Sequence, residues 1–102
     1  MKQYDMGRPR NIGKWGIMRE IYLMEFDQEV YIELVRSGML QEHLRMIDNQ
    51  ARERMRVLMD QGMRHRGITE DLKRRDQMEW IRQVNNLQHA AEENIKHELI
   101  YC

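Results

Sequence analysis

The chain has 102 residues, 41% of them hydrophobic and 33% charged, with 17 basic and 17 acidic side chains. This length suits one small domain, and we expect neither a membrane span nor a signal peptide because no apolar run approaches about 18 residues. The single cysteine excludes an internal disulfide, so we expect a cytoplasmic protein.

The composition also argues against a β fold. The sequence has one serine, one threonine, one phenylalanine and no Asn-Gly or Asp-Gly pair of the kind that favours hairpins. Its commonest residues include Met, Leu, Glu, Arg and Gln, which favour helices. We therefore predict an all-α protein.

The first segment, residues 1–13, contains the only proline, two glycines and no helical periodicity. This pattern is typical of a flexible arm. The arm is basic through Arg8 and Arg10, and Pro9 favours an extended backbone at Arg8.

A first helix is predicted from Lys14 to Arg36, where apolar residues recur at helical spacing in two adjacent stripes. A helix that is apolar over so much of its circumference must be covered on two sides. Asp27 is able to cap a new helix, so a break near Phe26 is an alternative. Gly38 then favours the left-handed residue that ends a helix.

A second helix is predicted from Met39 to Met63 or slightly beyond, because apolar residues recur along one face. Gly62 and Gly67 flank the segment where this helix is expected to fray and end.

Thr69 is the expected N-cap of a third helix, since neither proline nor glycine interrupts residues 68–102. About eight turns are longer than a compact bundle of this size needs, so we expect part of this helix to pair with a second copy in a homodimer. The residues predicted at that interface are Trp80, Val84, Asn85, Leu87 and Ala91. The fold expected from all elements is a three-helix bundle, with residues 14–102 as a single helical domain.

Candidate catalytic groups are few. Ser37 and Thr69 lie where helix capping explains them. His89, Glu93 and His97 follow one another at four-residue steps, but the two histidines lie about 12 Å apart along a helix, too far to share one metal ion. We therefore predict no enzymatic activity, no metal site and no cofactor.

Arginine outnumbers lysine, which favours contacts with phosphate or carboxylate groups. The neutral net charge is unlike that of a dedicated DNA-binding domain, and Glu53, Asp60, Asp71 and Asp76 are spaced to pair with nearby arginines. The residues predicted to contact nucleic acid are Arg8, Arg10, Lys14, Arg52, Arg56, Arg64, Arg66, Arg74 and Arg75. A separate acidic segment, a candidate for contact with a basic protein partner, contains Glu25, Asp27, Glu29 and Glu33.

Several strings of residues resemble the TnpV family of small transposon-encoded bacterial proteins. They are Ile12-Gly13-Lys14-Trp15-Gly16, Met18-Arg19, Tyr22-Leu23, Ser37-Gly38, His43-Leu44, Ile47-Asp48, Gly67-Ile68-Thr69-Glu70, Gln77-Met78-Glu79-Trp80, Asn85-Asn86 and Glu98-Leu99-Ile100-Tyr101. The sequence departs from the family around Phe26-Asp27-Gln28-Glu29, where relatives are more basic.

The resemblance implies a non-enzymatic accessory protein of a mobile element that binds element DNA or the recombinase in an excisionase-like role. An alternative is an inhibitor of host defence, similar to an anti-CRISPR protein, that binds a nuclease or effector complex through the acidic segment. We expect no membrane partner in either case.

Overall fold

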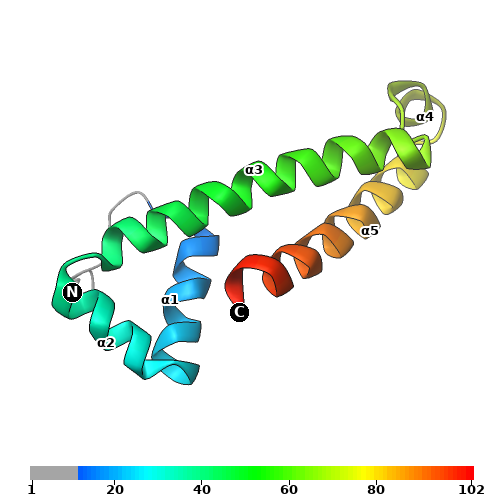
Figure 1. The fold of residues 1–102 in the computed structure, drawn as a ribbon. Helices are drawn as coiled ribbons and strands as arrows, with labels where there is room; N and C mark the ends of the chain where they lie inside the picture. Colours follow the sequence, from blue (N-terminus) through cyan, green and yellow to red (C-terminus); the bar gives the residue numbers. More distant parts are fainter. Residues whose placement is uncertain (1–11) are drawn as a thin grey trace, which may run out of the picture.

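The computed structural model describes residues 12–102, and every regular element in this range is helical (Figure 1). The elements are α1 (Lys14–Phe26), α2 (Gln28–Ser37), α3 (Leu40–Arg66), α4 (Glu70–Arg75), α5 (Gln77–Ile95) and a π-helical turn, η2 (Lys96–Ile100). The prediction of an all-α protein with a long C-terminal helix is confirmed, because α5 continues directly into η2. Except for residues 12 and 13, the predicted arm lies outside the described residues.

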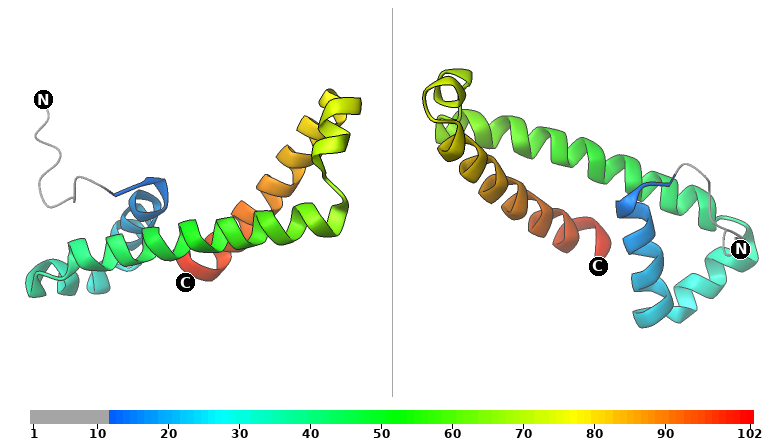
Figure 2. Two further views of the ribbon diagram at one scale, coloured as in Figure 1. Left: turned by 90° about the horizontal axis from the view of Figure 1, so that it is seen from above. Right: turned by 180° about the vertical axis from the view of Figure 1, so that it is seen from behind.

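Helix α3 forms the long axis of the molecule, and the other helices are arranged along its two halves (Figure 1). Helices α1 and α2 meet at an angle beside the N-terminal half, whereas α5 runs back along the C-terminal half (Figure 2). The molecule measures 55 × 30 × 19 Å, and its radius of gyration is 17.2 Å. A compact domain of this length would have a radius of gyration of about 13 Å, so the arrangement is elongated.

The prediction of three helices is wrong, because two aspartates divide the first and third predicted helices. Asp27 separates α1 from α2 with a backbone φ of −147° and ψ of 64°, which confirms the alternative of a break near Phe26. Asp76 interrupts the predicted run over residues 68–102 with φ −150° and ψ 84°. Its side chain accepts a hydrogen bond from the backbone N–H of Glu79 at 3.1 Å and so begins α5.

The predicted glycine stops and threonine cap are confirmed. Gly38 and Gly67 end α2 and α3 with φ of 78° and 68°, a left-handed conformation in which a side chain would be strained. Thr69 Oγ1 accepts a hydrogen bond from the backbone N–H of Leu72 at 3.1 Å. Helix α3 passes through Gly62 without fraying and ends at Arg66.

The core lies where the start of α1 and the end of α5 reach the middle of α3 (Figure 1). One cluster of buried side chains joins these elements, formed by Trp15, Ile47, Ala51, Ile95 and Ile100. Burying one large apolar side chain contributes about 1.5–3 kcal/mol. This cluster therefore holds together three elements that are widely separated in sequence.

Candidate functional site

The start of α1 is fastened to α3 by a buried carboxylate. The N-cap residue of α1 is Gly13, which has no side chain to cap the helix. Asp48 of α3, 1% exposed, accepts a hydrogen bond from the backbone N–H of Gly16 at 3.1 Å. Its other oxygen lies 3.3 Å from the Arg52 guanidinium in an ion pair. Asp48 thus supplies from α3 the negative charge that favours a helix N-terminus.

Two glycines permit this close approach of α1 to α3. A Cβ atom at Gly13 would lie 2.9 Å from Asp48 Oδ1, and one at Gly16 would lie 3.0 Å from the backbone oxygen of Leu44. Both distances are shorter than side-chain carbon atoms normally tolerate. The glycines that contribute to the family resemblance therefore have a packing role.

An arginine joins α1 to the last residues of the chain. Arg19, 9% exposed, donates hydrogen bonds through Nη1 to the backbone oxygens of Ile100 at 2.8 Å and Cys102 at 3.0 Å. Its Nε atom donates to His43 Nε2 of α3 at 3.3 Å. A cation beside the carbonyl end of η2 is favourable, because unpaired carbonyls carry partial negative charge there.

The environment of His43 favours the neutral form of its imidazole. Burial and then the positive charge of Arg19 lower the pKa of His43 below its ordinary value of 6.5. A neutral imidazole has one nitrogen free to accept, which the hydrogen bond from Arg19 requires. We call the contacts of Gly13, Gly16, Arg19, His43 and Asp48 the junction.

The acidic residues gather where α1 turns into α2. Glu25, Glu29 and Glu33 are exposed and Asp27 is half-buried, and these four residues form what we call the acidic corner. No lysine or arginine occurs between positions 20 and 35. The acidic corner lies at the opposite end of the molecule from α4 (Figure 1).

Little of the rest of the chain packs against helix α2. None of its ten residues is buried, although one of its faces is apolar. Val30, Ile32 and Val35 are 40%, 50% and 52% exposed, and Phe26 at the end of α1 is 73% exposed. The prediction that this apolar region is covered on two sides is wrong for α2 within one chain.

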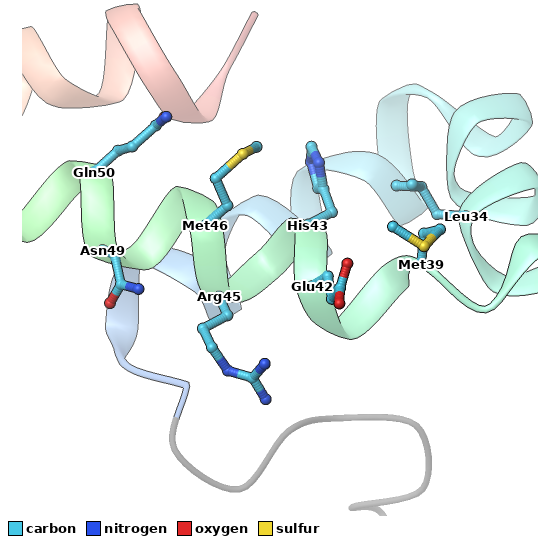
Figure 3. A pocket seen from close by; sticks show the side chains of 8 residues that line it. All are labelled: Leu34, Met39, Glu42, His43, Arg45, Met46, Asn49 and Gln50. Atoms are coloured by element: carbon cyan, nitrogen blue, oxygen red, sulfur yellow. The ribbon is translucent and has the colours of Figure 1, made fainter.

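A groove of about 760 Å³ lies along the first half of α3, beside Leu34 of α2 (Figure 3). Leu34, Met39 and Met46 provide apolar surface, and His43 projects from α3 on the same side as Met46. The polar residues that complete the lining are Glu42, Arg45, Asn49 and Gln50. Methionine side chains adapt to differently shaped partners, so this groove suits a protein segment.

The residues predicted to contact nucleic acid are divided between the middle and one end of the molecule. Arg8 and Arg10 lie outside the described residues. Lys14, Arg52 and Arg56 lie near the middle, on α1 and α3. The remaining four define what we call the basic end, where α3 and α4 finish: Arg64, Arg66, Arg74 and Arg75. Arg52 and Arg66 are separated by roughly 20 Å of helix, at about 1.5 Å per residue.

Most of these cations face a carboxylate. The predicted pairing is confirmed for Glu53, Asp60 and Asp71, whereas Asp76 caps α5 instead. Lys14 Nζ lies 3.0 Å from Glu92 across the α1–α5 contact, and this hydrogen bond lowers the pKa of Glu92. The pairs within single helices are Arg52–Asp48, Arg56–Glu53, Arg64–Asp60, Arg74–Asp71 and Arg75–Asp71. Exposed pairs of this kind are weak in water, so a phosphate is able to compete for the arginines.

The stripe predicted to form a homodimer interface is partly used within the chain. Leu87 and Ala91 are 6% and 3% exposed and face α3 beside Gly62, where a Cβ atom would collide with Leu87. Trp80 and Val84 are half-buried, and Asn85 is exposed. Lys73 of α4 covers the Trp80 ring at 4.7 Å from its centre. The surface of α5 that remains available to a second copy of the chain is therefore narrower than the spacing of its apolar residues indicates.

The hydroxyl groups of Ser37 and Thr69 both act at helix ends. Ser37 donates a hydrogen bond to the backbone oxygen of Leu34 at 3.3 Å, and Thr69 caps α4. Across residues 12–102, no three His, Cys, Asp or Glu side chains converge in a way that would hold a metal ion. Within the same range, none of the helices combines the length and apolar character needed to cross a bilayer.

The fold defines an elongated all-α protein with an acidic corner at one end and four exposed arginines, most of them paired with carboxylates, at the other. Residues 3–100 match the family described as transposon-encoded protein TnpV, and the chain belongs to this family. Searches of curated proteins and of solved structures gave no match.

Sequence reasoning did not assign a role to Asp48, Arg19 or His43. All three act through contacts between residues 24 to 83 positions apart. The one available signal was that these residues lie within the strings that resemble the TnpV family.

Proposed function

We propose that this chain is a non-enzymatic accessory protein of its transposon and that it acts by binding the recombinase of the element. The observation that carries the proposal is the exposure of α2, in which no residue is buried despite an apolar face. A contiguous apolar face on a soluble helix is typical of a protein interaction site. Membership of the transposon-encoded TnpV family supports a partner from the same element.

A groove beside α2, lined by Leu34 on a different side of this helix from Ile32, adds apolar surface from α3. Leu34 and Met39 lie at the α2 side and Met46 at the α3 side, so an inserted helix would contact both elements (Figure 3). Such a partner would present its apolar side chains at helical spacing. The junction holds α1 in place and thereby orients α2, because the two helices are joined by Asp27 alone.

The basic end supports a DNA contact as the second part of an excisionase-like role. Arg64 and Arg66 of α3 lie at the same end of the molecule as Arg74 and Arg75 of α4 (Figure 1). Because the molecule is 55 Å long, one copy is able to engage DNA at this end and the recombinase at the other. Contacts with phosphates would make the affinity for DNA fall steeply with salt.

An inhibitor of host defence is the second candidate, and the acidic corner favours it. Four carboxylates without an intervening cation suit the basic channel of a nuclease as well as they suit a recombinase. The two candidates differ in the protein that is bound.

The decisive experiment measures binding of the purified recombinase by calorimetry. The double variant Ile32→Gln/Val35→Gln should weaken binding by roughly tenfold or more, since both side chains are half-exposed and contribute only at an interface. Met78→Gln is the matched control, because Met78 is 77% exposed at the other end of the molecule. Equal loss in both variants, or no binding of the recombinase, would overturn the proposal. Binding of a host effector nuclease instead would favour the second candidate.

The DNA contact is tested separately with labelled transposon-end duplex in a salt series. Arg74→Gln/Arg75→Gln should weaken binding and reduce the salt slope by about two if both contact phosphates. Arg36→Gln, an exposed change on α2, is the control. Unchanged affinity and slope would remove the basic end from the DNA contact.

A further inference from the structure

A second cavity lies at the end of α1, on the side where the chain finishes. Its volume is about 430 Å³, and its lining residues are Met18, Ile21, Tyr22, Glu25, Phe26 and Tyr101. Half of these residues are aromatic, and one is a carboxylate from the acidic corner. We call this cavity the aromatic pocket.

Three rings in the aromatic pocket form a connected set. The Tyr22 ring centre lies 5.4 Å from that of Phe26 and 5.5 Å from that of Tyr101, with interplanar angles of 34° and 42°. The Tyr22–Phe26 contact is ordinary for residues four apart on a helix. Tyr101 arrives from beyond η2, where Arg19 holds the adjacent backbone. The junction therefore places the third ring against α1.

Two of these rings remain open to solvent, whereas Tyr22 is half-buried. Phe26 is 73% exposed and Tyr101 is 48% exposed, so their faces are accessible to a partner. The face of an aromatic ring attracts cations, and Arg19 already lies 5.7 Å from the centre of the Tyr22 ring. Arg19 is held by its hydrogen bonds to the backbone oxygens of Ile100 and Cys102. The ring faces of Phe26 and Tyr101 are therefore the ones that a cation of a partner protein would contact.

Glu25 supplies the second element of cation recognition. It lines the pocket, and it forms no ion pair with any described residue. The acidic corner around it adds further negative charge without an intervening lysine or arginine. A planar guanidinium is able to stack on a ring and donate a forked pair of hydrogen bonds to a carboxylate, whereas an ammonium does so less well.

We propose that the aromatic pocket binds an arginine side chain presented by a basic segment of a partner protein. The negative charge of the acidic corner disfavours nucleic acid as the occupant and favours a cationic polypeptide. The inference deepens the proposed function, on which it rests for the identity of the partner, by naming the side chain that the recombinase presents. The pocket itself is testable without the recombinase.

The test uses a blocked alanine-based helical peptide that carries several arginines, titrated into the full chain and followed by NMR. The control peptide replaces each arginine by citrulline, which has nearly the same shape and no charge. We expect the ring protons of Phe26 and Tyr101 to shift with the arginine peptide, and the citrulline peptide to bind roughly tenfold or more weakly.

Two matched pairs of variants test whether the arginine peptide binds at the aromatic pocket. Glu25→Gln and Glu29→Gln change the net charge equally, but only Glu25 lines the pocket, so Glu25→Gln should weaken binding several-fold more. Phe26→Leu should weaken it, and Met78→Leu, at the other end of the molecule, should not. Melting temperatures establish that each variant is folded.

Equal binding of the arginine and citrulline peptides would overturn the proposal, as would equal effects of Glu25→Gln and Glu29→Gln. If Phe26→Leu instead abolishes self-association measured by sedimentation, a second copy occupies the pocket and the proposal is wrong. If the α2 variant loses recombinase binding but still binds the arginine peptide, the result bears on the proposed function and leaves the proposal for the aromatic pocket unchanged. The two proposals can therefore fail independently.

Discussion

The junction and helix α2 use polar and apolar residues in opposite ways. At the junction, Asp48 and Arg19 are buried, and each forms a hydrogen bond with a backbone group of another element. In α2, Ile32 and Val35 are half-exposed, and no residue is buried. Buried polar groups with partners specify how elements join, whereas exposed apolar groups add little to the stability of a single chain. The contrast separates the part of the chain that builds the fold from the part available for binding.

The largest expected contrast is between Trp15 and Ile32. Trp15→Ala should lower the free energy of unfolding by about 3–5 kcal/mol, because this 4% exposed side chain fills the core. Ile32→Ala should change it by less than about 0.5 kcal/mol, since exposed positions away from the core contribute little. Urea denaturation followed by circular dichroism measures both. Similar losses would contradict the division between the hydrophobic core and α2.

Asp48 tests whether the junction depends on its buried carboxylate. Asp48→Ala should cost about 2 kcal/mol, because it removes a charged hydrogen bond to the Gly16 N–H and leaves that donor without its partner. Arg52→Gln is the control, since its side chain is 60% exposed. A loss as large in Arg52→Gln would place the stabilisation in the ion pair and not in the cap.

The pH dependence of stability provides a smaller effect at the junction. The folded-state pKa of His43 is lowered, so the unfolded chain binds the proton more readily. The stabilisation that neutral His43 contributes is therefore complete above pH 6.5 and is lost progressively as the pH falls below that value. His43→Gln should flatten the stability profile in this window while retaining an acceptor for Arg19.

Three glutamates affect stability in a lower pH range than His43, so the two contributions can be measured separately. Salt bridges or hydrogen bonds lower the pKa of Glu53, Glu79 and Glu92, so their contribution is lost only below pH 4.5. An unchanged slope of stability below pH 6.5 in His43→Gln would show that His43 does not titrate as its surroundings indicate.

The smallest stability effect is expected at the basic end. Asp60→Asn removes the exposed pair with Arg64 and should change stability by less than about 0.5 kcal/mol. It should also strengthen binding to DNA, because Arg64 no longer has a competing carboxylate. Weaker DNA binding than in the parent protein would show that the pair itself positions Arg64.

Local features of the fold were predictable from the sequence. The stops at Gly38 and Gly67, the cap at Thr69 and the alternative break near Phe26 each depend on a few adjacent residues. The break at Asp76 had a signal too, because an aspartate followed three residues later by a glutamate is typical of a helix start. The long apolar periodicity on either side obscured it.

The junction was not predictable in this way. Asp48 acts on a backbone group 32 positions away, and Arg19 acts on one 81 positions away. No periodicity relates such residues, because their proximity results from the path of the whole chain. Gly62 shows the same limit: it looks like a helix breaker in the sequence, yet it lies against Leu87 of α5, where a side chain has no room.

The hydrogen bond between Arg19 and Ile100 also has a consequence for synthesis. A ribosome releases α1 and α2 early, but Trp15 gains its core partners Ile95 and Ile100 only after most of the chain has been translated. Until then, the apolar residues of α1 and α2 lie on a nascent chain without their core. The apolar residues of α1 are therefore exposed for longer during translation than those of α5, which follow the rest of the core.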